Sequence, residues 1–294
     1  MKLVTFSAGA GAPRVGIADP GREVVRDLTG QLPEGVGVLD LIQDWDAYGP
    51  KLEAAQGLPE VTLSSVALHA PIPQPRRDII CVGKNYREHV VEFGRSGYDS
   101  PDRSEAIPDA PVVFPKLTTS VTGPYDDIES HPGITEELDY EAELGVIIGR
   151  GGRGISREDA FDHVWGYTVI NDFTARDLQR KHKQWLLGKS LDTHCPMGPF
   201  AVSKDEVPEP RELRVQSWVN GEPRQDGTVS DLIFDIPELI STISAGISLL
   251  PGDIIATGTP VGVGIGFDPP RFMKSGDVIE ISITGMGTQR NRIR

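Results

Sequence analysis

The sequence predicts a mainly β fold with short helices, preceded by a small α+β domain at the N-terminus. Glycine and proline account for 33 and 24 of the 294 residues and recur between short apolar runs, which is typical of strands joined by turns. The Asn220-Gly221 pair between two such runs is a strong hairpin signal. Residues 251–258 and 275–285 also have the pattern of a turn followed by a strand.

The N-terminal α+β domain is expected to span residues 1–70. The stretches MKLVTF, RVGIAD and REVVRDLT have the composition of short strands, and residues 38–55 carry apolar side chains at helical spacing. Prolines 71, 73 and 75 then favour a stiff, extended connector. Residues 71–294 are expected to form the second, β-rich domain.

Charge and composition exclude several classes of partner. The formal charge of −14 has the wrong sign for a protein that neutralises a phosphate backbone, so nucleic acid is not an expected partner. The chain begins with a weak, glycine-broken apolar stretch and has no run of about 20 apolar residues, so we expect a cytoplasmic protein that does not enter a membrane. Cys81 and Cys195 form no CxxC pattern and are expected to be buried thiols.

An acidic strand is the first candidate for chemistry. Apolar and other residues alternate from Leu138 to Ile148, and Glu141 and Glu143 lie on the same side, with Cα atoms roughly 7 Å apart. Two such carboxylates repel each other unless they are solvated, protonated or bridged by a cation, and oxygen ligands suit Mg²⁺, Mn²⁺ or Ca²⁺. The alternative is a half-exposed strand with a solvated acidic face.

A third carboxylate lies at the end of another predicted strand. Residues 164–179 indicate a strand that ends at Asn171-Asp172 and turns into a helix, where Thr174 and Asp177 match a capping box. Asp172 is therefore a candidate either for helix capping or for metal binding. With Glu141 and Glu143 it would complete a divalent-cation site with bound waters.

His89 and Glu92 are the candidates for proton transfer. They are three residues apart in a polar segment that follows the apolar stretch DIICVG, so on a helix they share a face. A carboxylate that fixes the tautomer and stabilises the imidazolium makes a histidine a plausible general base. The alternative is an ordinary surface pair, and the other histidines show no pairing that favours a metal.

A glycine-rich motif raises a competing hypothesis, a dinucleotide-binding oxidoreductase. Gly149, Gly151 and Gly154 follow a strand, and a helix capped by Ser156 could follow them. The acidic residues of the preceding strand would be costly in a doubly covered parallel sheet, and no regular alternation of strands and helices surrounds the motif. A non-catalytic metal-binding or scaffold role is the other alternative, favoured if His89 lies far from the carboxylates.

Six ordered segments across residues 78–294 resemble the signature blocks of the fumarylacetoacetate hydrolase family. They are CVGKNYREH, LDYEAELGVIIG, NDFTARDLQ, GKSLDTHCPMGP, VNGEPRQDG and LLPGDIIATGTPVGVG. The closest type is the small family member that acts as an acylpyruvase, an oxaloacetate decarboxylase or a 2-oxo-diene-dioate isomerase. Ordered blocks are far more specific than one acidic strand.

The resemblance implies a mixed β-sandwich roll, a homodimer and a site that holds Mg²⁺ or Mn²⁺, with Ca²⁺ as a substitute. The implied metal ligands are Glu141, Glu143 and Asp172. The implied catalytic residues are His89, Glu92 and Lys189, and the implied substrate contacts are Gln179, Arg176 and Thr259. From the residues alone, Lys189 could equally be a solvated lysine and Thr259 a turn residue.

The resemblance also implies a small 2-oxo acid as substrate. The expected reaction is hydrolysis of the C3–C4 bond of a 2,4-dioxo acid of the acylpyruvate or fumarylpyruvate type, in which a cation stabilises an enolate at C3 and His89 activates water. Oxaloacetate decarboxylation and 2-oxo acid isomerisation or tautomerisation use the same enolate and are the alternatives. The long polar stretch at 92–111 does not identify the contacts that select a substrate tail.

Overall fold

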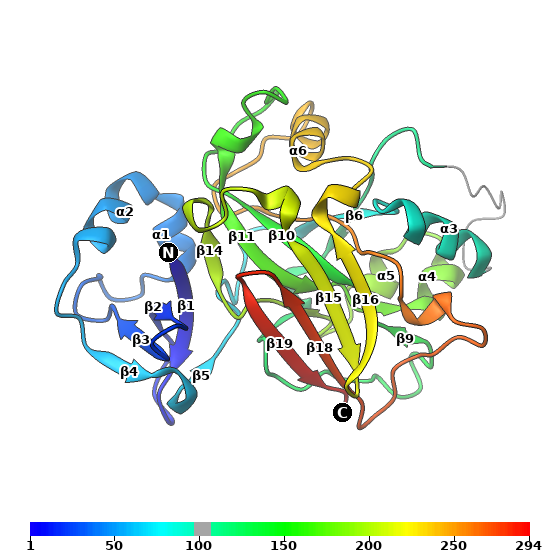
Figure 1. Ribbon diagram of the computed structural model, residues 1–294, viewed down its shortest axis with the longest axis horizontal. Coiled ribbons are helices and arrows are strands. Elements are labelled where there is room, and N and C mark those ends of the chain that lie inside the picture. Colours follow the sequence, from blue (N-terminus) through cyan, green and yellow to red (C-terminus); the bar gives the residue numbers. More distant parts are fainter. Residues whose placement is uncertain (97–106) are drawn as a thin grey trace.

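A computed structural model describes residues 1–96 and 107–294 of the chain (Figure 1). Residues 97–106, half of the long polar stretch at 92–111, lie outside the described residues. The fold is mainly β with short helices, as the sequence predicts.

The N-terminal strands form one end of a large sheet and are accompanied by two helices. Three of them are the predicted strands, but the predicted helix at 38–55 is broken at Asp44 into two helices. The elements are β1 (Lys2–Ser7), β2 (Arg14–Asp19), β3 (Val24–Asp27), α1 (Val38–Gln43), α2 (Trp45–Ala54), β4 (Glu60–Thr62), η1 (Leu63–Ser65) and β5 (Ala67–Leu68). Because β1 pairs with β14 of the main body, the sheet continues past residue 70, and the domain boundary there stays a prediction.

The large sheet runs in the order β4-β3-β2-β1-β14-β11-β10-β17-β6-β7, with β5 added to β1. Its strands in the main body are β6 (Ile79–Gly83), β7 (Val112–Lys116), β10 (Ala142–Ile148), β11 (Val164–Asn171), β14 (Ala201–Ser203) and β17 (Ile254–Ala256). The central strands β10 and β11 are buried on both faces.

A second sheet of four antiparallel strands covers one face of β10 and β11 (Figure 1). Its strands are β15 (Arg214–Val219), β16 (Glu222–Thr228), β18 (Val278–Ile283) and β19 (Gly287–Arg292). The hairpin between β15 and β16 turns at the predicted Asn220-Gly221 pair, and both residues have the positive φ that a two-residue hairpin loop needs. Leu144 and Val169 of the large sheet share one apolar core with Val215 and Ile281 of the smaller one.

Five of the nine candidate site residues lie on three short helices, α3 (Arg87–Ser96), α4 (Arg176–His182) and α5 (Leu186–Lys189). A further helix is α6 (Ile236–Ser244). The short strand pairs are β9 (Leu138–Asp139) with β12 (Thr174–Ala175) and β8 (Val121–Thr122) with β13 (Cys195–Pro196). The 3₁₀ segments are η2 (Thr118–Ser120), η3 (Ala160–His163), η4 (Lys204–Glu206), η5 (Pro210–Glu212), η6 (Val229–Asp231) and η7 (Gly264–Gly266).

One local expectation, the uninterrupted acidic strand, and two alternatives, the solvated acidic face and the dinucleotide fingerprint, need correction. The predicted acidic strand is interrupted at Tyr140 and Glu141, and its acidic side is buried rather than solvated, because the sheet is covered on both faces. The glycine motif after β10 leads into η3 and then β11, which pairs antiparallel with β10. That connection is not the parallel βαβ unit that a dinucleotide fingerprint requires.

One further expectation is confirmed within the described part of the chain. Cys81 and Cys195 are buried free thiols. Over residues 1–96 and 107–294, no helix combines the length and the apolar character that a bilayer crossing requires.

Candidate active site

Three carboxylates from two paired segments converge at the end of β10 and β11. Glu143 lies on β10, Glu141 directly precedes that strand, and Asp172 directly follows β11. The antiparallel register pairs Ala142 with Asn171, so the Asp172 N–H donates to the Glu141 carbonyl at 2.9 Å. One carboxylate oxygen from each of the three residues lies within 4.8 Å of the others. Strand pairing thus places close together residues that are about 30 positions apart in sequence.

Buried cations surround two of these three carboxylates. Lys189 Nζ lies 2.8 Å from Glu141 Oε2 and 2.7 Å from Asp172 Oδ2. Lys116 Nζ lies 2.8 Å from Asp172 Oδ1, and Arg176 Nη2 lies 2.7 Å from Glu141 Oε1. All of these side chains are buried, so the charges interact with little screening by water.

The pKa shifts separate Glu141 from Glu143. Burial alone would raise the pKa of Glu141, but the nearby positive charges, Lys189 foremost, outweigh burial and lower that pKa to about 2. Burial raises the pKa of Glu143 well above its usual range, and repulsion from Asp172 and Glu141 adds to this effect. A further positive charge beside Glu143 would therefore favour its ionised form.

A divalent cation would supply this positive charge. Three buried carboxylate groups within 4.8 Å of one another offer the hard oxygen ligands that Mg²⁺, Mn²⁺ and Ca²⁺ prefer. A cation held between them would favour the ionised form of Glu143 and offset the repulsion among the three groups. Glu141, Glu143 and Asp172 are the residues that would hold it.

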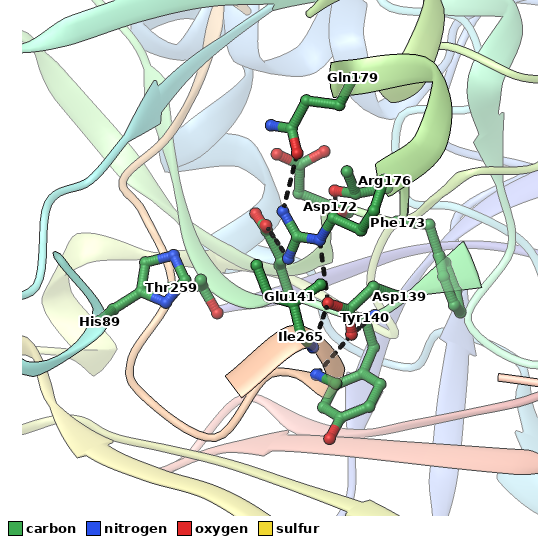
Figure 2. A network of polar contacts seen from close by, with 12 residues as sticks. His89, Asp139, Tyr140, Glu141, Asp172, Phe173, Arg176, Gln179, Thr259 and Ile265 are labelled. Atoms are coloured by element: carbon green, nitrogen blue, oxygen red, sulfur yellow. Dashed lines mark hydrogen bonds and ion pairs between the residues drawn. The ribbon is translucent and has the colours of Figure 1, made fainter. Parts of the chain in front are cut away.

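His89 and Glu92 form a pair on α3. His89 Nδ1 lies 3.0 Å from Glu92 Oε2, and because an ionised carboxylate only accepts, Nδ1 donates and Nε2 is left as the basic nitrogen. Glu92 Oε1 also accepts a hydrogen bond from the Gly262 N–H at 2.9 Å. The histidine is 4% exposed, and Figure 2 draws it together with Thr259 and Glu141. The pair is therefore buried and held, unlike an ordinary surface pair.

One small cavity joins the histidine to the carboxylates. Seven of the nine predicted site residues line this cavity, and the other two, Glu92 and Asp172, do not. The cavity has a volume of about 10 Å³, which is space for roughly one water. The lining residues are Val82, Gly83, Lys84, His89, Phe93, Glu141, Glu143, Arg176, Gln179, Trp185, Lys189 and Thr259.

The predicted substrate-binding residues are held by contacts within the chain. Arg176 Nη1 donates to Gln179 Oε1 at 3.2 Å. The Thr259 hydroxyl donates to the Ala142 carbonyl at 3.0 Å and accepts a hydrogen bond from Gln225 Nε2 at 2.7 Å. Gln179, Arg176 and Thr259 therefore have fixed positions at the cavity wall before any substrate enters.

The predicted capping box at Thr174 is wrong. The residue before the first turn of α4 is Ala175, and no side chain caps the helix. The Asp177 carboxylate instead accepts hydrogen bonds from the Thr135 hydroxyl and the Glu136 N–H. Asp172 thus has no role in capping α4.

The sequence interpretation missed two buried charged residues, Asp139 and Lys116. Asp139 is fully buried and its carboxylate Oδ2 lies 2.9 Å from Arg176 Nε. Besides its ion pair with Asp172, Lys116 donates to the Phe173 carbonyl at 3.0 Å and to the Lys189 carbonyl. The acidic pattern of residues 138–148 could have indicated Asp139. No sequence pattern indicated Lys116, a lone lysine at the end of β7.

His194 is a buried histidine, and its lowered pKa leads us to expect a fold that is sensitive to acid. Burial, more than any other effect, lowers the pKa of His194 to about 3. Its Nε2 lies 3.0 Å from the Glu129 carbonyl, and Nδ1 has no hydrogen-bond partner in the described part of the chain. The unfolded chain takes up this proton near pH ~6.5, before the folded chain does, so stability is complete above that pH and falls as the pH drops towards 3.

Urea unfolding at pH 7 and pH 5 measures this effect. The wild-type chain should lose about 2 kcal/mol more free energy of unfolding between these pH values than His194→Gln does. His182→Gln, at an exposed histidine, is the control and should match the wild type. An equal loss in wild type and His194→Gln would show that His194 is not protonated differently in the two states.

The comparisons with known proteins agree with this architecture. The model of the fumarylacetoacetate (FAA) hydrolase C-terminal domain matches residues 78–294. Oxaloacetate tautomerase YisK of Bacillus subtilis is 57% identical over 233 residues, which cover 79% of this chain and 74% of that protein. The chain belongs to the fumarylacetoacetate hydrolase family.

Two solved structures of the family extend the match to the whole chain. Fumarylacetoacetate hydrolase from psychrophilic Exiguobacterium antarcticum is 37% identical, with a TM-score of 0.83 over 100% of this chain and 99% of that one. Maleylpyruvate hydrolase from Sphingobium sp. SYK-6, solved with manganese(II) and pyruvate, is 31% identical, with a TM-score of 0.79 over 100% of this chain and 98% of that one.

Proposed function

We propose that the chain is a divalent-cation-dependent enzyme that moves a proton at C3 of a small 2-oxo acid, and that its reaction is the keto–enol tautomerisation of oxaloacetate. The observation that carries the proposal is the single cavity that His89 shares with Glu141 and Glu143. A proton carrier and a cation site facing one substrate are the groups that tautomerisation requires.

The chain's own residues divide the work. Glu141, Glu143 and Asp172 would hold Mg²⁺ or Mn²⁺, which supplies Lewis-acid polarisation of the 2-oxo and carboxylate oxygens when bound. His89 Nε2 takes a proton from C3 of the keto form and then gives that proton to the 2-oxygen, directly or through water. The reverse sequence takes the hydroxyl proton of the enol form and returns a proton to C3. Glu92 holds Nδ1 and stabilises the imidazolium formed in between.

The remaining cavity residues would bind and orient the substrate. Lys189 and Arg176 supply positive charge beside the carboxylates, where a negatively charged substrate has to enter. Gln179 and Thr259 present polar atoms that are fixed by the contacts described above. These roles explain why the cavity is lined by cations as well as by acids.

Tautomerisation is preferred here to the acylpyruvate hydrolysis expected from the sequence. The 57% identical relative is named for oxaloacetate tautomerisation, whereas the relative named for maleylpyruvate hydrolysis is 31% identical. Hydrolysis of a dioxo acid is the second candidate, supported by that relative's manganese and pyruvate. A homodimeric assembly and a cytoplasmic location remain predictions.

A substrate panel tests the proposal. The purified chain with Mg²⁺ or Mn²⁺ should accelerate the interconversion of enol and keto oxaloacetate far more than it releases pyruvate from oxaloacetate or from maleylpyruvate. A chelator should remove the effect, and added metal should restore it. Faster carbon–carbon cleavage than tautomerisation would favour the hydrolase or the decarboxylase instead.

A further inference from the structure

We propose that Asp139 is a positioning residue that holds the base-bearing helix α3 in register with the cation-binding carboxylates. This inference rests on the proposed function, in which His89 transfers the proton. Asp139 touches neither the cavity nor His89. It acts through Arg176 on one side and through the loop 262–266 on the other.

Asp139 is the centre of the polar network in Figure 2. Its side chain is 0% exposed, and it accepts hydrogen bonds from four donors. Oδ2 accepts from Arg176 Nε at 2.9 Å and from the Ile265 N–H at 3.1 Å. Oδ1 accepts from the Gly264 N–H at 2.6 Å and from the Tyr140 N–H at 2.9 Å. A buried carboxylate with this many donors fixes the groups around it.

The first arm of the network leads to the carboxylates. Arg176 uses Nε for Asp139 and Nη2 for Glu141, the latter at 2.7 Å. One guanidinium therefore joins the buried Asp139 to a candidate metal ligand. Glu143 and Asp172 are placed independently, because each is anchored by the pairing of β10 with β11.

The second arm leads to α3 through the loop 262–266. The Gly262 N–H donates to Glu92 Oε1 at 2.9 Å, and Glu92 in turn holds His89. A Cβ atom on Gly266 would lie 1.9 Å from Glu92 Oε1, so this close approach requires glycine. Phe93 of α3 packs with Val263 and Ile265 in a small apolar cluster of their own.

Asp139 is what anchors this loop. Gly262, Gly264 and Gly266 give the loop high backbone freedom, which must be restricted if Glu92 is to keep its place. Without the Asp139 carboxylate, the Gly264 and Ile265 N–H groups lose their acceptor. We therefore expect α3 and His89 to become mobile while the carboxylates on the strand ends stay together.

Two variants separate the two arms. Asp139→Asn keeps the shape but turns a donor group towards Arg176 Nε or the loop. Gly266→Ala places a methyl group against Glu92 rather than against Asp139 or Arg176, so it remains informative if Asp139→Asn fails to fold. Asp277→Asn is the control, because this aspartate caps an exposed turn through the Lys274 N–H.

Three measurements test the inference: kcat and KM for oxaloacetate tautomerisation, Mn²⁺ affinity by calorimetry, and backbone hydrogen exchange by mass spectrometry. Both variants should lower kcat roughly 10- to 100-fold, with the Mn²⁺ Kd within about threefold of wild type. Exchange should accelerate in residues 87–96 and stay unchanged in β10. Asp277→Asn should match the wild type in all three.

Several results would overturn the inference. Wild-type kcat in either variant, unchanged exchange in α3, or a loss of Mn²⁺ affinity as large as the loss of kcat would each do so. The last would mean that Asp139 acts only through the metal ligand Glu141. If the wild-type chain shows no tautomerisation, the proposed function fails, but exchange in α3 still decides whether Asp139 positions the helix.

Discussion

Glu143→Gln is expected to abolish useful Mg²⁺ and Mn²⁺ binding and to lower tautomerisation on the order of 10³-fold. The amide keeps the size of the side chain but removes one of the three buried carboxylates that face the common centre. Calorimetric titration with Mn²⁺ and steady-state kinetics at saturating metal measure the two effects.

The same substitution, which should weaken metal binding, is expected to preserve or raise the stability of the metal-free chain. Because burial and repulsion raise the pKa of Glu143 in the folded chain, this carboxyl group lowers the stability of the metal-free fold at neutral pH, whether it stays charged or takes up a proton. Metal-free Glu143→Gln should therefore have a Tm equal to or above that of the wild type, and added Mn²⁺ should raise the Tm only in the wild type. Glu158→Gln, at an exposed glutamate, is the matched control. Unaltered Mn²⁺ affinity in Glu143→Gln would refute the metal site.

His89→Ala is expected to lower kcat by roughly 10²- to 10⁴-fold while Mn²⁺ affinity stays close to that of the wild type. The histidine lies on α3, whereas the three carboxylates lie at the ends of β10 and β11, so the two functions should be separable. Steady-state kinetics with oxaloacetate and calorimetry with Mn²⁺ provide the comparison.

Glu92→Gln is a milder perturbation of the same proton transfer. It should impair the same step more mildly, because an amide still accepts a hydrogen bond from His89 Nδ1 but no longer stabilises the imidazolium. If His89→Ala retained wild-type turnover at saturating Mg²⁺, the histidine would be structural and another group would have to move the proton.

Local sequence patterns predicted the parts of this molecule that depend on neighbouring residues. Alternation along residues 138–148 placed Glu141 and Glu143 on one side, and Asn220-Gly221 marked the hairpin between β15 and β16. The spacing of His89 and Glu92 predicted their contact on α3. The resemblance to the family, carried by six ordered blocks, supplied the association of these segments that no single pattern contains.

Features that depend on distant segments were predicted poorly. Alternation cannot show that both faces of β10 are covered, so the solvated acidic face was wrong. Thr174 and Asp177 match a capping box, but Asp177 finds better donors in Thr135 and Glu136, some 40 positions earlier in the chain. Asp139 acquires its role only when Arg176 and the loop 262–266 fold around it.

Proton exchange at C3 tests the central claim most directly. Oxaloacetate or the slower-reacting pyruvate is incubated in D₂O with the chain, and ¹H NMR follows the loss of the C3 proton signal with Mg²⁺, with a chelator, and with His89→Ala. The account predicts fast exchange only with metal and His89 both present, and exchange roughly 10²- to 10⁴-fold slower in His89→Ala. Exchange as fast as that of the Mg²⁺-loaded wild type, in either the chelated wild-type chain or the Mg²⁺-loaded His89→Ala variant, would contradict it.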